Sequence, residues 1–314
     1  MSEEKKYLIA NPNFSAGKDM AVVNAVADSV SGIEGVKLVK VDPEAEFNRT
    51  VLTLIGEPEP LTEALIAVAA KCAELIDMRE HKGDHPRMGA LDVVPIFPLR
   101  NITIEETIEF TLEAGRRIFE ETKLPVYFIG DAAATEERKP LTFIRKGQYE
   151  GIKQLLLETK EDPDRQEEYE SRKPDLSTDG LLSETFGAMI LEPQEEKAAF
   201  FNVFLDTEDV DLAQKIANSI RRAKGGFTTV TAKGTKFAGR KGSVVSLNIL
   251  DTDITPIYRP FEMIKFEAER YGVRVTGSEL VGIVRLDFVV EGFARYLQLE
   301  NFKPEHIIET CLMQ

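Results

Sequence analysis

The sequence of 314 residues contains no tryptophan, three histidines and only two cysteines, Cys72 and Cys311. Two cysteines exclude a disulfide-stabilised scaffold and suit a reducing compartment. No run of apolar residues approaches the roughly 18 needed to span a bilayer. The charged N-terminus, MSEEKKYLIANPN, lacks the apolar core of a secretory signal. The sequence therefore predicts a cytoplasmic protein with no membrane partner.

Basic residues are outnumbered by acidic ones, 39 to 54, so the protein has a net charge of −15. This balance argues against a nucleic-acid partner and against an anionic membrane surface. An anionic small-molecule ligand would need cations gathered in a local pocket. Apolar residues make up 43% and charged residues 30% of the chain, which is typical of globular proteins. The length favours two domains.

Strand-like and helix-like hydrophobic patterns alternate along the chain and give the order β-α-β-β-α-β twice. This order is the split βαβ, or ferredoxin-like, motif. A doubly wound parallel sheet is less favoured, since the connections 42–49 and 232–243 are too short for crossover helices. The sequence predicts an α+β protein (an α/β sandwich) of two ferredoxin-like subdomains with mixed or antiparallel sheets. The expected strands are 6–11, 36–42, 49–56, 92–99, 126–130, 198–206, 227–232, 243–250 and 273–277, and the expected helices are 19–31, 59–78, 104–121, 149–160, 209–224 and 255–271.

The segment 160–176 is almost entirely polar and contains two prolines. It offers little apolar surface for a core, so we interpret it as a connector or mobile loop. This places an N-terminal subdomain at 1–176 and a C-terminal subdomain at 177–314.

Functional groups concentrate in the segment 76–95, which holds two of the three histidines in the pentapeptide HKGDH (81–85). Gly83, Pro86 and Gly89 make its backbone irregular, and it joins a helix to a strand. A polar loop at such a junction is a common place for catalysis, whereas a solvated charged loop is the alternative. No nucleophile elbow or phosphate loop is present, so the residues favour acid–base chemistry by a histidine.

A metal site must be weighed at the same segment, since His81 and His85 have the i, i+4 spacing of a zinc-binding helix. Pro86 disfavours a helical conformation at His85, and Lys82 stands where the zinc motif has glutamate. The sequence therefore predicts no metal. A metal-dependent hydrolase using His81, Asp84 and His85 remains an alternative.

The string IDMREHKGDHPRMGALDVVPIFPL (76–99) resembles the signature of the glutamate formiminotransferase family. Further similar segments follow the same order through almost the whole chain. The resemblance implies two ferredoxin-like subdomains, a homodimer, and transfer of a formimino group from N-formimino-L-glutamate to tetrahydrofolate, a co-substrate, during histidine degradation. A non-catalytic folate-binding protein on the same fold is a further alternative. The similar segments are NPNFSAGKD (11–19), VDPEAEFNRTVLTLIGEPE (41–59), LPVYFIGDAA (124–133), IRKGQYEG (144–151), VVSLNILD (244–251) and GSELVGIVRL (277–286).

The resemblance also implies site residues. The family's catalytic histidine aligns with His85, and an aspartate near its substrate aligns with Asp42. Four nearby residues are candidates for binding the substrate's carboxylates: Lys82, Arg87, Asn48 and Arg49. Folate contacts are expected in the segment 177–187, at Ser177, Thr178, Asp179, Gly180, Thr185, Phe186 and Gly187.

Overall fold

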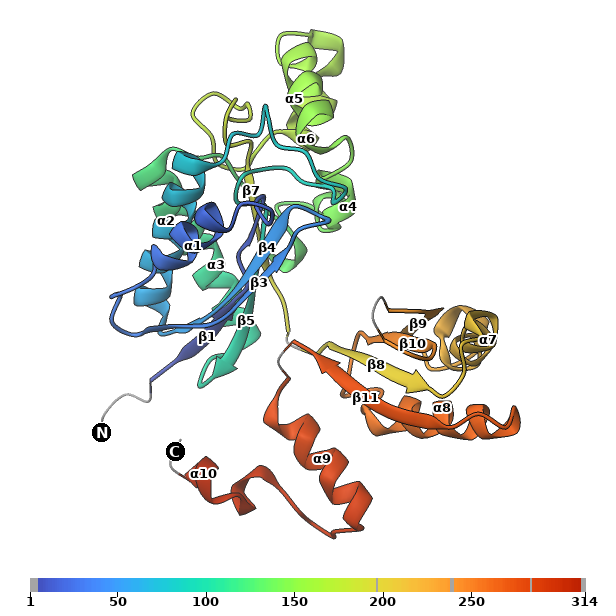
Figure 1. Ribbon diagram of the computed structural model, residues 1–314. Coiled ribbons are helices and arrows are strands. Elements are labelled where there is room, and N and C mark those ends of the chain that lie inside the picture. Colours follow the sequence, from blue (N-terminus) through green and yellow to red (C-terminus); the bar gives the residue numbers. More distant parts are fainter. Residues whose placement is uncertain (1–4, 196, 238–239, 283, 312–314) are drawn as a thin grey trace. The chain divides into compact units, whose positions relative to one another are not determined.

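A computed structural model describes residues 5–195, 197–237, 240–282 and 284–311 (Figure 1). The chain divides into two compact units, Met1–Glu195 and Glu196–Gln314, each with its own hydrophobic core. The units are described separately below.

The first unit is built on a mixed sheet with the order β2-β4-β1-β5-β7-β6, in which β3 also pairs with β4. Within it, β3, β4, β1 and β5 are antiparallel neighbours, which is the split βαβ arrangement. Two parallel strands, β7 and β6, extend this sheet beyond β5. The strands are β1 (Tyr7–Ala10), β2 (Asn13–Phe14), β3 (Val36–Glu44), β4 (Arg49–Gly56), β5 (Val93–Arg100), β6 (Val126–Phe128) and β7 (Met189–Pro193).

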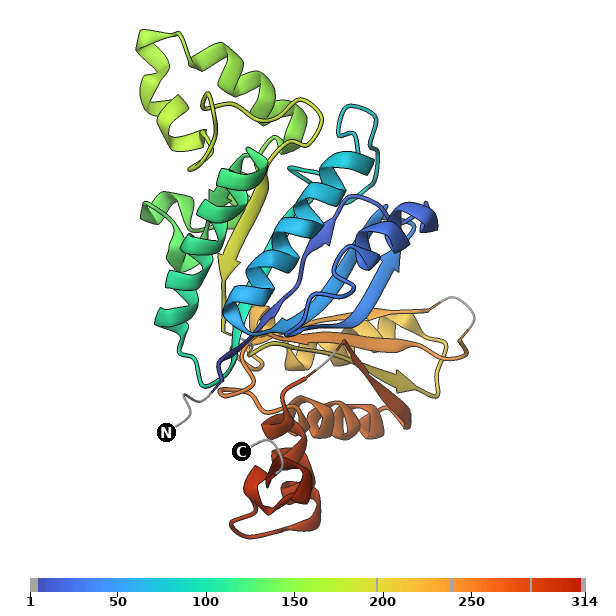
Figure 2. The same ribbon diagram turned by 90° about the vertical axis from the view of Figure 1, so that its left-hand side faces the viewer.

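Three helices, α1 (Met20–Asp28), α2 (Pro58–Leu75) and α3 (Ile104–Thr122), pack against one face of this sheet (Figures 1 and 2). Their starts follow from the sequence: the Asp19 side chain caps α1, a proline begins α2, and Thr103 and Glu106 form a capping box on α3. The alternate positions of β4 fill the core beneath α1 and α2. The intervening positions, which begin with Arg49, therefore face the other side of the sheet.

The segment between β6 and β7 is mainly helical. It contains α4 (Leu141–Ile144), α5 (Gln148–Thr159) and α6 (Gln166–Arg172), with the 3₁₀ turns η1 (Gly130–Ala132), η2 (Glu136–Arg138) and η3 (Pro163–Arg165). Figures 1 and 2 both show α5 and α6 side by side at one end of the unit.

The interpretation of 160–176 as a connector is wrong. The segment forms η3 and α6, and it is anchored by Tyr169 and Arg172, which are buried despite the polar composition around them. The Arg172 guanidinium donates to the carbonyl oxygen of Lys146 at 2.7 Å and lies over the Phe143 ring. The chain divides after Glu195 rather than after residue 176, because β7 pairs with β5 and β6 and so belongs to the first sheet.

The second unit repeats the motif with an antiparallel sheet in the order β11-β8-β10-β9. Both units thus carry the same split βαβ order, so the predicted fold class is confirmed. In the short connection 232–243, residues 238 and 239 lie outside the described residues. The elements are β8 (Ala199–Leu205), α7 (Val210–Ile220), η4 (Arg222–Lys224), β9 (Val230–Thr235), β10 (Val244–Ile249), α8 (Tyr258–Arg270), β11 (Val275–Val281), α9 (Leu286–Leu297), η5 (Pro304–His306) and α10 (Ile308–Cys311).

Several elements escaped the sequence analysis: β2, β7, α4, α6, α9 and α10. Each of the first four is short, and β7 (Met189–Pro193) is buried on both faces, so it shows no alternation of apolar and polar residues. Among the described residues, no helix combines the length and the apolar character that crossing a membrane requires.

Candidate active site

The histidine-bearing segment leaves the C-terminal end of α2 and enters β5, as the sequence predicts. It is tied to its neighbours through the backbone. Met78 N–H donates to the carbonyl oxygen of Thr185 and Ala90 N–H donates to that of Phe186, each at 2.7 Å. Ser15 N–H in turn donates to the carbonyl of Ala90 at 2.8 Å. These bonds give a loop without regular secondary structure a fixed path.

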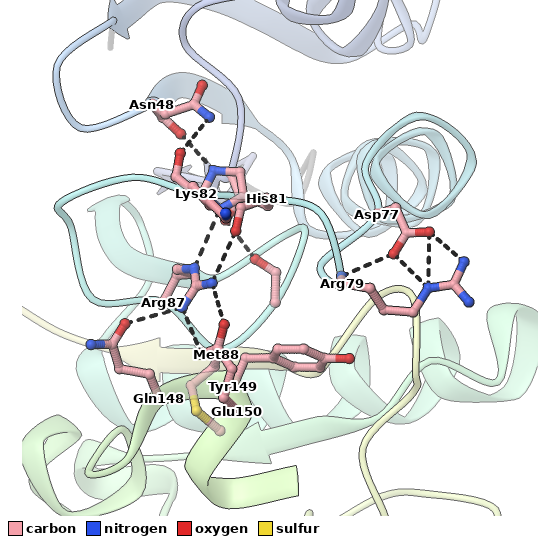
Figure 3. Close-up of polar contacts among 12 residues, drawn as sticks. Asn48, Asp77, Arg79, His81, Lys82, Arg87, Met88, Gln148, Tyr149 and Glu150 are labelled. Carbon is pink, nitrogen blue, oxygen red and sulfur yellow. Dashed lines mark hydrogen bonds and ion pairs between the residues drawn. The ribbon is translucent and has the colours of Figure 1, made fainter.

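The loop crosses the β3–β4 turn so closely that a side chain at the crossing is excluded. A Cβ on Gly83 would lie 2.3 Å from the carbonyl oxygen of Phe47. Asn48, in the left-handed region with φ 49°, donates through Nδ2 to the carbonyl of Lys82 at 3.0 Å (Figure 3). Its Oδ1 accepts from Gly17 and Lys18 N–H at 3.0 and 3.1 Å. The Asn48 amide thus joins three segments of the chain.

Both ring nitrogens of His81 contact the protein. Nδ1 lies 3.3 Å from Nε of Arg87, which carries a proton and must donate. Nε2 therefore holds the ring proton and donates to the carbonyl of Asn48 at 3.1 Å. Burial lowers the pKa of His81, and the nearby Arg87 adds to this, whereas the bond to Asn48 opposes it. His81 is thus a neutral imidazole with a hydrogen bond at each ring nitrogen, and these bonds position the loop.

Arg87 is buried and its donors are occupied (Figure 3). The guanidinium forms a two-pronged ion pair with Glu150, at 2.6 and 2.9 Å. It also donates to Oε1 of Gln148 at 3.1 Å and to the carbonyl of His81 at 3.1 Å. The hydrogen bond from Arg87 lowers the pKa of Glu150. The structure thus brings Arg87 to the site but binds it to the start of α5.

His85 differs from His81 in having one nitrogen turned to a charged group. Nδ1 lies 2.7 Å from the carbonyl oxygen of Pro86, which can only accept, so Nδ1 carries the proton. The Nε2 lone pair then faces Nη1 of Arg49 at 2.8 Å. Burial lowers the pKa of His85, Arg49 lowers it further, and the bond to Pro86 opposes both. The Phe47 and His85 rings form a T-shaped pair with their centroids 5.9 Å apart. The arrangement holds a neutral imidazole with a basic Nε2.

A second arginine, Arg145, lies at the C-terminal cap of α4 and pairs with a buried carboxylate. Its Nη2 lies 3.0 Å from Oδ2 of Asp92, whose Oδ1 accepts from Met88 N–H at 2.7 Å. Burial raises the pKa of Asp92, and Arg145 opposes this. Arg145 also lowers the pKa of both Arg49 and His85 by its charge, after the larger effect of burial in each case. The charge of Arg145 therefore acts on both groups, while its own contact is with Asp92.

Asp42 and Lys82 lie at the edge of this site. Asp42 stands opposite Val51 in the β3–β4 ladder, so its side chain shares a sheet face with Arg49. Its carboxylate pairs with Lys40 at 2.8 Å, and in the described part of the chain it has no hydrogen bond to His85. The Lys82 side chain is exposed.

The segment 177–187 lies beside the histidine loop, but its residues differ in what they expose. Thr178, Asp179 and Thr185 are exposed. Phe186 is fully buried, and Gly187 forms a bridge with Gly89. Two backbone turns stabilise the rest: Gly180 N–H donates to the Ser177 hydroxyl at 2.8 Å, and Leu181 N–H donates to Asp179 at 3.1 Å.

The sequence predicts no role for Arg145, which lies within the family-like string IRKGQYEG (144–151). In the structure Arg145 directly follows the buried Ile144 at the C-terminal cap of α4. Among the described residues, no group of three or more His, Cys, Asp and Glu side chains could hold a metal ion.

Comparison with known families matches residues 7–190 to the formiminotransferase domain, N-terminal subdomain, and residues 200–310 to the formiminotransferase domain. Glutamate formimidoyltransferase of Streptococcus pyogenes is 38% identical over 96% of this chain and 97% of its own length. The Thermoplasma acidophilum protein of the same name is 34% identical over 95% and 94%. The mouse formimidoyltransferase-cyclodeaminase is 35% identical over 96% of this chain and 55% of its own length.

Proposed function

Because the chain belongs to the formiminotransferase family, a family of transferases, we propose that it moves a formimino group from N-formimino-L-glutamate to tetrahydrofolate. The products are 5-formiminotetrahydrofolate and L-glutamate, as in histidine degradation. The transfer removes one proton from the attacking nitrogen and delivers one to the departing nitrogen. A single basic group between the two nitrogens can do both.

The observation that carries the proposal is the tautomer of His85. Its Nδ1–H is bonded to Pro86, which leaves the Nε2 lone pair as the only basic position on the ring. The lowered pKa of His85 keeps that lone pair free of a proton at neutral pH. His85 is therefore poised as a base first and as an acid afterwards.

His85 would act at both ends of the transfer. Tetrahydrofolate supplies the amine N5, which takes the formimino carbon. Nε2 of His85 accepts the proton that N5 releases and returns it to the nitrogen of the departing glutamate. One N–C bond forms and one C–N bond breaks, so no oxidant or reductant is needed. The bond from Nδ1 to Pro86 holds the imidazole in one orientation through both transfers.

We propose that Asp42 interacts with the positive charge of the formimino group, which is an amidine. Asp42 and Arg49 occupy diagonal positions on one face of the β3–β4 ladder. Diagonal neighbours in an antiparallel pair are about 7–8 Å apart. A small cation held by Asp42 would therefore lie within reach of the His85 ring, which contacts Arg49.

The four residues proposed for substrate binding divide by their contacts. Arg49 has a buried Nε with no hydrogen-bond partner among the described residues, and the Lys82 ammonium is exposed. We assign these two to the anionic groups of the substrates. The donors of Arg87 and the Asn48 amide are already bonded within the protein, so we assign them to positioning the loop.

For tetrahydrofolate we propose contacts along the exposed side of 177–187, at Thr178, Asp179 and Thr185. The pterin presents an amino group and ring N–H donors side by side, which a carboxylate such as Asp179 matches. Because Phe186 is buried and Gly187 lies opposite Gly89 in a β-bridge, we assign these two to supporting that segment. Asp179→Asn keeps the acceptor for Leu181 N–H, and we expect it to raise KM for tetrahydrofolate about 5-fold with kcat unchanged. An unchanged KM would remove Asp179 from the folate contacts.

The resemblance to the family also leads us to propose a homodimer that acts in the cytoplasm. Sedimentation velocity over a range of protein concentrations tests the dimer. A single species with the 35.1 kDa mass of one chain would contradict it.

The overall proposal is tested by incubating the purified protein with N-formimino-L-glutamate and tetrahydrofolate. We expect L-glutamate and 5-formiminotetrahydrofolate to appear in equal amounts, and neither product when tetrahydrofolate is omitted. Release of glutamate without tetrahydrofolate would instead indicate the hydrolase alternative. Folate binding without any turnover would indicate the non-catalytic alternative. The hydrolase would also require His81 to give up one of its two protein contacts to a metal.

A further inference from the structure

We propose that Asp92 is a positioning residue for the reaction: through the amide of Met88 it fixes the Pro86 carbonyl that orients the His85 ring. The inference deepens the proposed function and rests on it for the role of His85. The motifs of the sequence assign no role to Asp92, which directly precedes β5 at the end of the histidine loop.

The Asp92 side chain is a fixed point inside the first unit. The residue is 2% exposed, and both of its carboxylate oxygens are bonded. Oδ1 accepts from Met88 N–H at 2.7 Å, and Oδ2 accepts from Nη2 of Arg145 at 3.0 Å. Its backbone N–H donates to the carbonyl of Asn13 and its backbone carbonyl accepts from Ile190 N–H, each at 2.7 Å. A residue held at all of these groups can hold the loop beside it in place.

The Asp92 carboxylate acts on the peptide unit between Arg87 and Met88. The N–H of this unit donates to Asp92, and its carbonyl accepts from Tyr149 N–H at 3.0 Å. Because a peptide unit is planar, bonds at both of its polar groups fix its orientation. The ring of Pro86 restricts the backbone on the other side. The Pro86 carbonyl therefore lies one residue from a peptide plane that Asp92 helps to hold.

The Pro86 carbonyl is the group that holds the proposed base, since it accepts from Nδ1–H of His85 at 2.7 Å. The other contacts of this ring are Arg49 at Nε2 and the Phe47 ring. Neither of them fixes the imidazole from the Nδ1 side. If the Pro86 carbonyl moved, the imidazole would turn, and Nε2 would no longer be aimed at the reacting nitrogens. A displacement of about 1 Å in a reacting group can cost roughly 100-fold in rate.

The charge of Asp92 is the alternative explanation, because Asp92 interacts electrostatically with Arg145, Arg49 and Arg87. The contacts favour positioning, since the hydrogen bond to Met88 N–H is the shorter of the two made by the carboxylate and reaches the histidine loop directly. The two explanations make different predictions for variants that lack the charge but keep the hydrogen bond.

The experiment compares two double variants from which the charged pair is absent. Asp92→Asn with Arg145→Met keeps an acceptor for Met88 N–H, because the amide oxygen of asparagine takes the place of Oδ1. Asp92→Ala with Arg145→Met lacks that acceptor. Each variant loses one negative and one positive charge, and Glu192, which also interacts with Arg145, loses this partner in both. The two therefore differ in the hydrogen bond to Met88 and in the space that alanine leaves empty.

Asp175 provides the control for that empty space. Its Oδ2 accepts from Phe128 N–H and from Nη2 of Arg138, each at 2.8 Å, so it too joins a backbone amide to an arginine. Asp175→Asn and Asp175→Ala, each with Arg138→Met, repeat the comparison away from the histidine loop. We expect these two controls to differ in Tm and to have the same kcat.

The measurements are kcat, Tm and an NMR signal of the His85 ring. In protein with isotopically labelled histidine, the Nδ1–H proton is visible while a hydrogen bond slows its exchange with water, and His85→Ala identifies the signal. We expect the asparagine variant to keep this signal and a kcat within about 3-fold of the wild type. The alanine variant should lose the signal, and its kcat should fall by about 10- to 100-fold.

Equal kcat in the two double variants would overturn the proposal and would assign any common loss to charge. A lowered kcat with the Nδ1–H signal retained, or a wild type without the signal, would also overturn it. If the alanine variant does not fold, Asp92→Leu with Arg145→Met replaces it, because leucine fills the space and has no acceptor. If the wild type transfers no formimino group, the proposed function fails, and the NMR comparison alone decides whether Asp92 positions His85.

Discussion

The two histidines of the HKGDH segment lie four residues apart, yet the arginines beside them differ in how completely they are hydrogen-bonded. Beside His81, the donors of Arg87 are bonded to protein acceptors: Glu150, Gln148 and the histidine itself. At His85, by contrast, the Arg49 guanidinium faces Nε2 and retains a buried Nε without a partner among the described residues. A fully bonded cluster stabilises structure, whereas an underbonded one is ready for a ligand. The comparison separates the residues that stabilise the loop from those that we propose to act on the substrates.

The largest expected effect distinguishes the two rings directly. His85→Ala should lower kcat by about 10²- to 10⁴-fold, because it removes the proposed proton-transfer group, and Tm should change little because the ring is half exposed. Steady-state kinetics and a thermal melt check this. His306→Ala, which removes the exposed histidine of the second unit, is the control with unchanged turnover. Activity of His85→Ala within a few-fold of the wild type would refute the assignment.

His81→Ala should show the reverse pattern. It leaves Arg87 Nε and the Asn48 carbonyl without their partner, so we expect the free energy of unfolding to fall by about 1–3 kcal/mol. Denaturation in urea measures this loss. Because the pKa of His81 is lowered in the folded protein, its contribution is present above the unfolded value of 6.5 and is lost as the pH falls below it. A variant of unchanged stability at pH 7 would show that the cluster is not structural.

Asp42→Asn tests whether the negative charge of the Asp42 carboxylate contributes to the reaction. We expect kcat to fall about 10-fold with little change in the Kd for tetrahydrofolate, because the carboxylate is proposed to interact with the amidinium. Lys40→Gln removes the present partner of Asp42 and serves as the control. If the folate Kd rises and kcat at saturation stays constant, Asp42 would be a binding residue.

The smallest expected effect is a shift in the pH dependence of kcat/KM. Since the pKa of His85 is lowered, kcat/KM should stay level through neutral pH and decline only at pH values below the ordinary 6.5. Arg49→Gln removes one cause of the lowering, so the acid limb should move to higher pH. Arg79→Gln, a surface cation paired with Asp77, should leave the profile in place. A profile of Arg49→Gln that coincides with the wild type would show that Arg49 does not tune the base.

The sequence predicted the fold well because the elements that define it are amphipathic. The alternation of β4 and the buried stripe of α2 are local properties, and both were found within a few residues of their true bounds. The failure at 160–176 has a physical cause. Tyr169 and Arg172 anchor α6 to segments distant in the sequence. The polar composition of 160–176 as a whole gives no sign that these two side chains are buried.

The roles of the site residues stay predictions. The structure shows that the histidine loop contacts both the Asn48–Arg49 turn and the segment 177–187. The sequence could not show that Arg87 is bonded to Glu150 whereas Arg49 has a spare donor, because the number of partners of a side chain depends on distant segments. Arg145 was missed for the same reason.

The position of β7 in the first sheet has a consequence for synthesis of the chain. β5 and β6 do not pair with each other; both pair with β7, which follows β6 only after residues 129–188. A chain still on the ribosome therefore exposes two unpaired strand edges until those sixty residues and β7 itself have emerged. The same late segment, 177–187, carries the acceptors for Met78 and Ala90 N–H. The histidine loop thus gains these two hydrogen bonds last. A nascent chain that has not yet emerged as far as residue 193 exposes the edges of β5 and β6 to premature association.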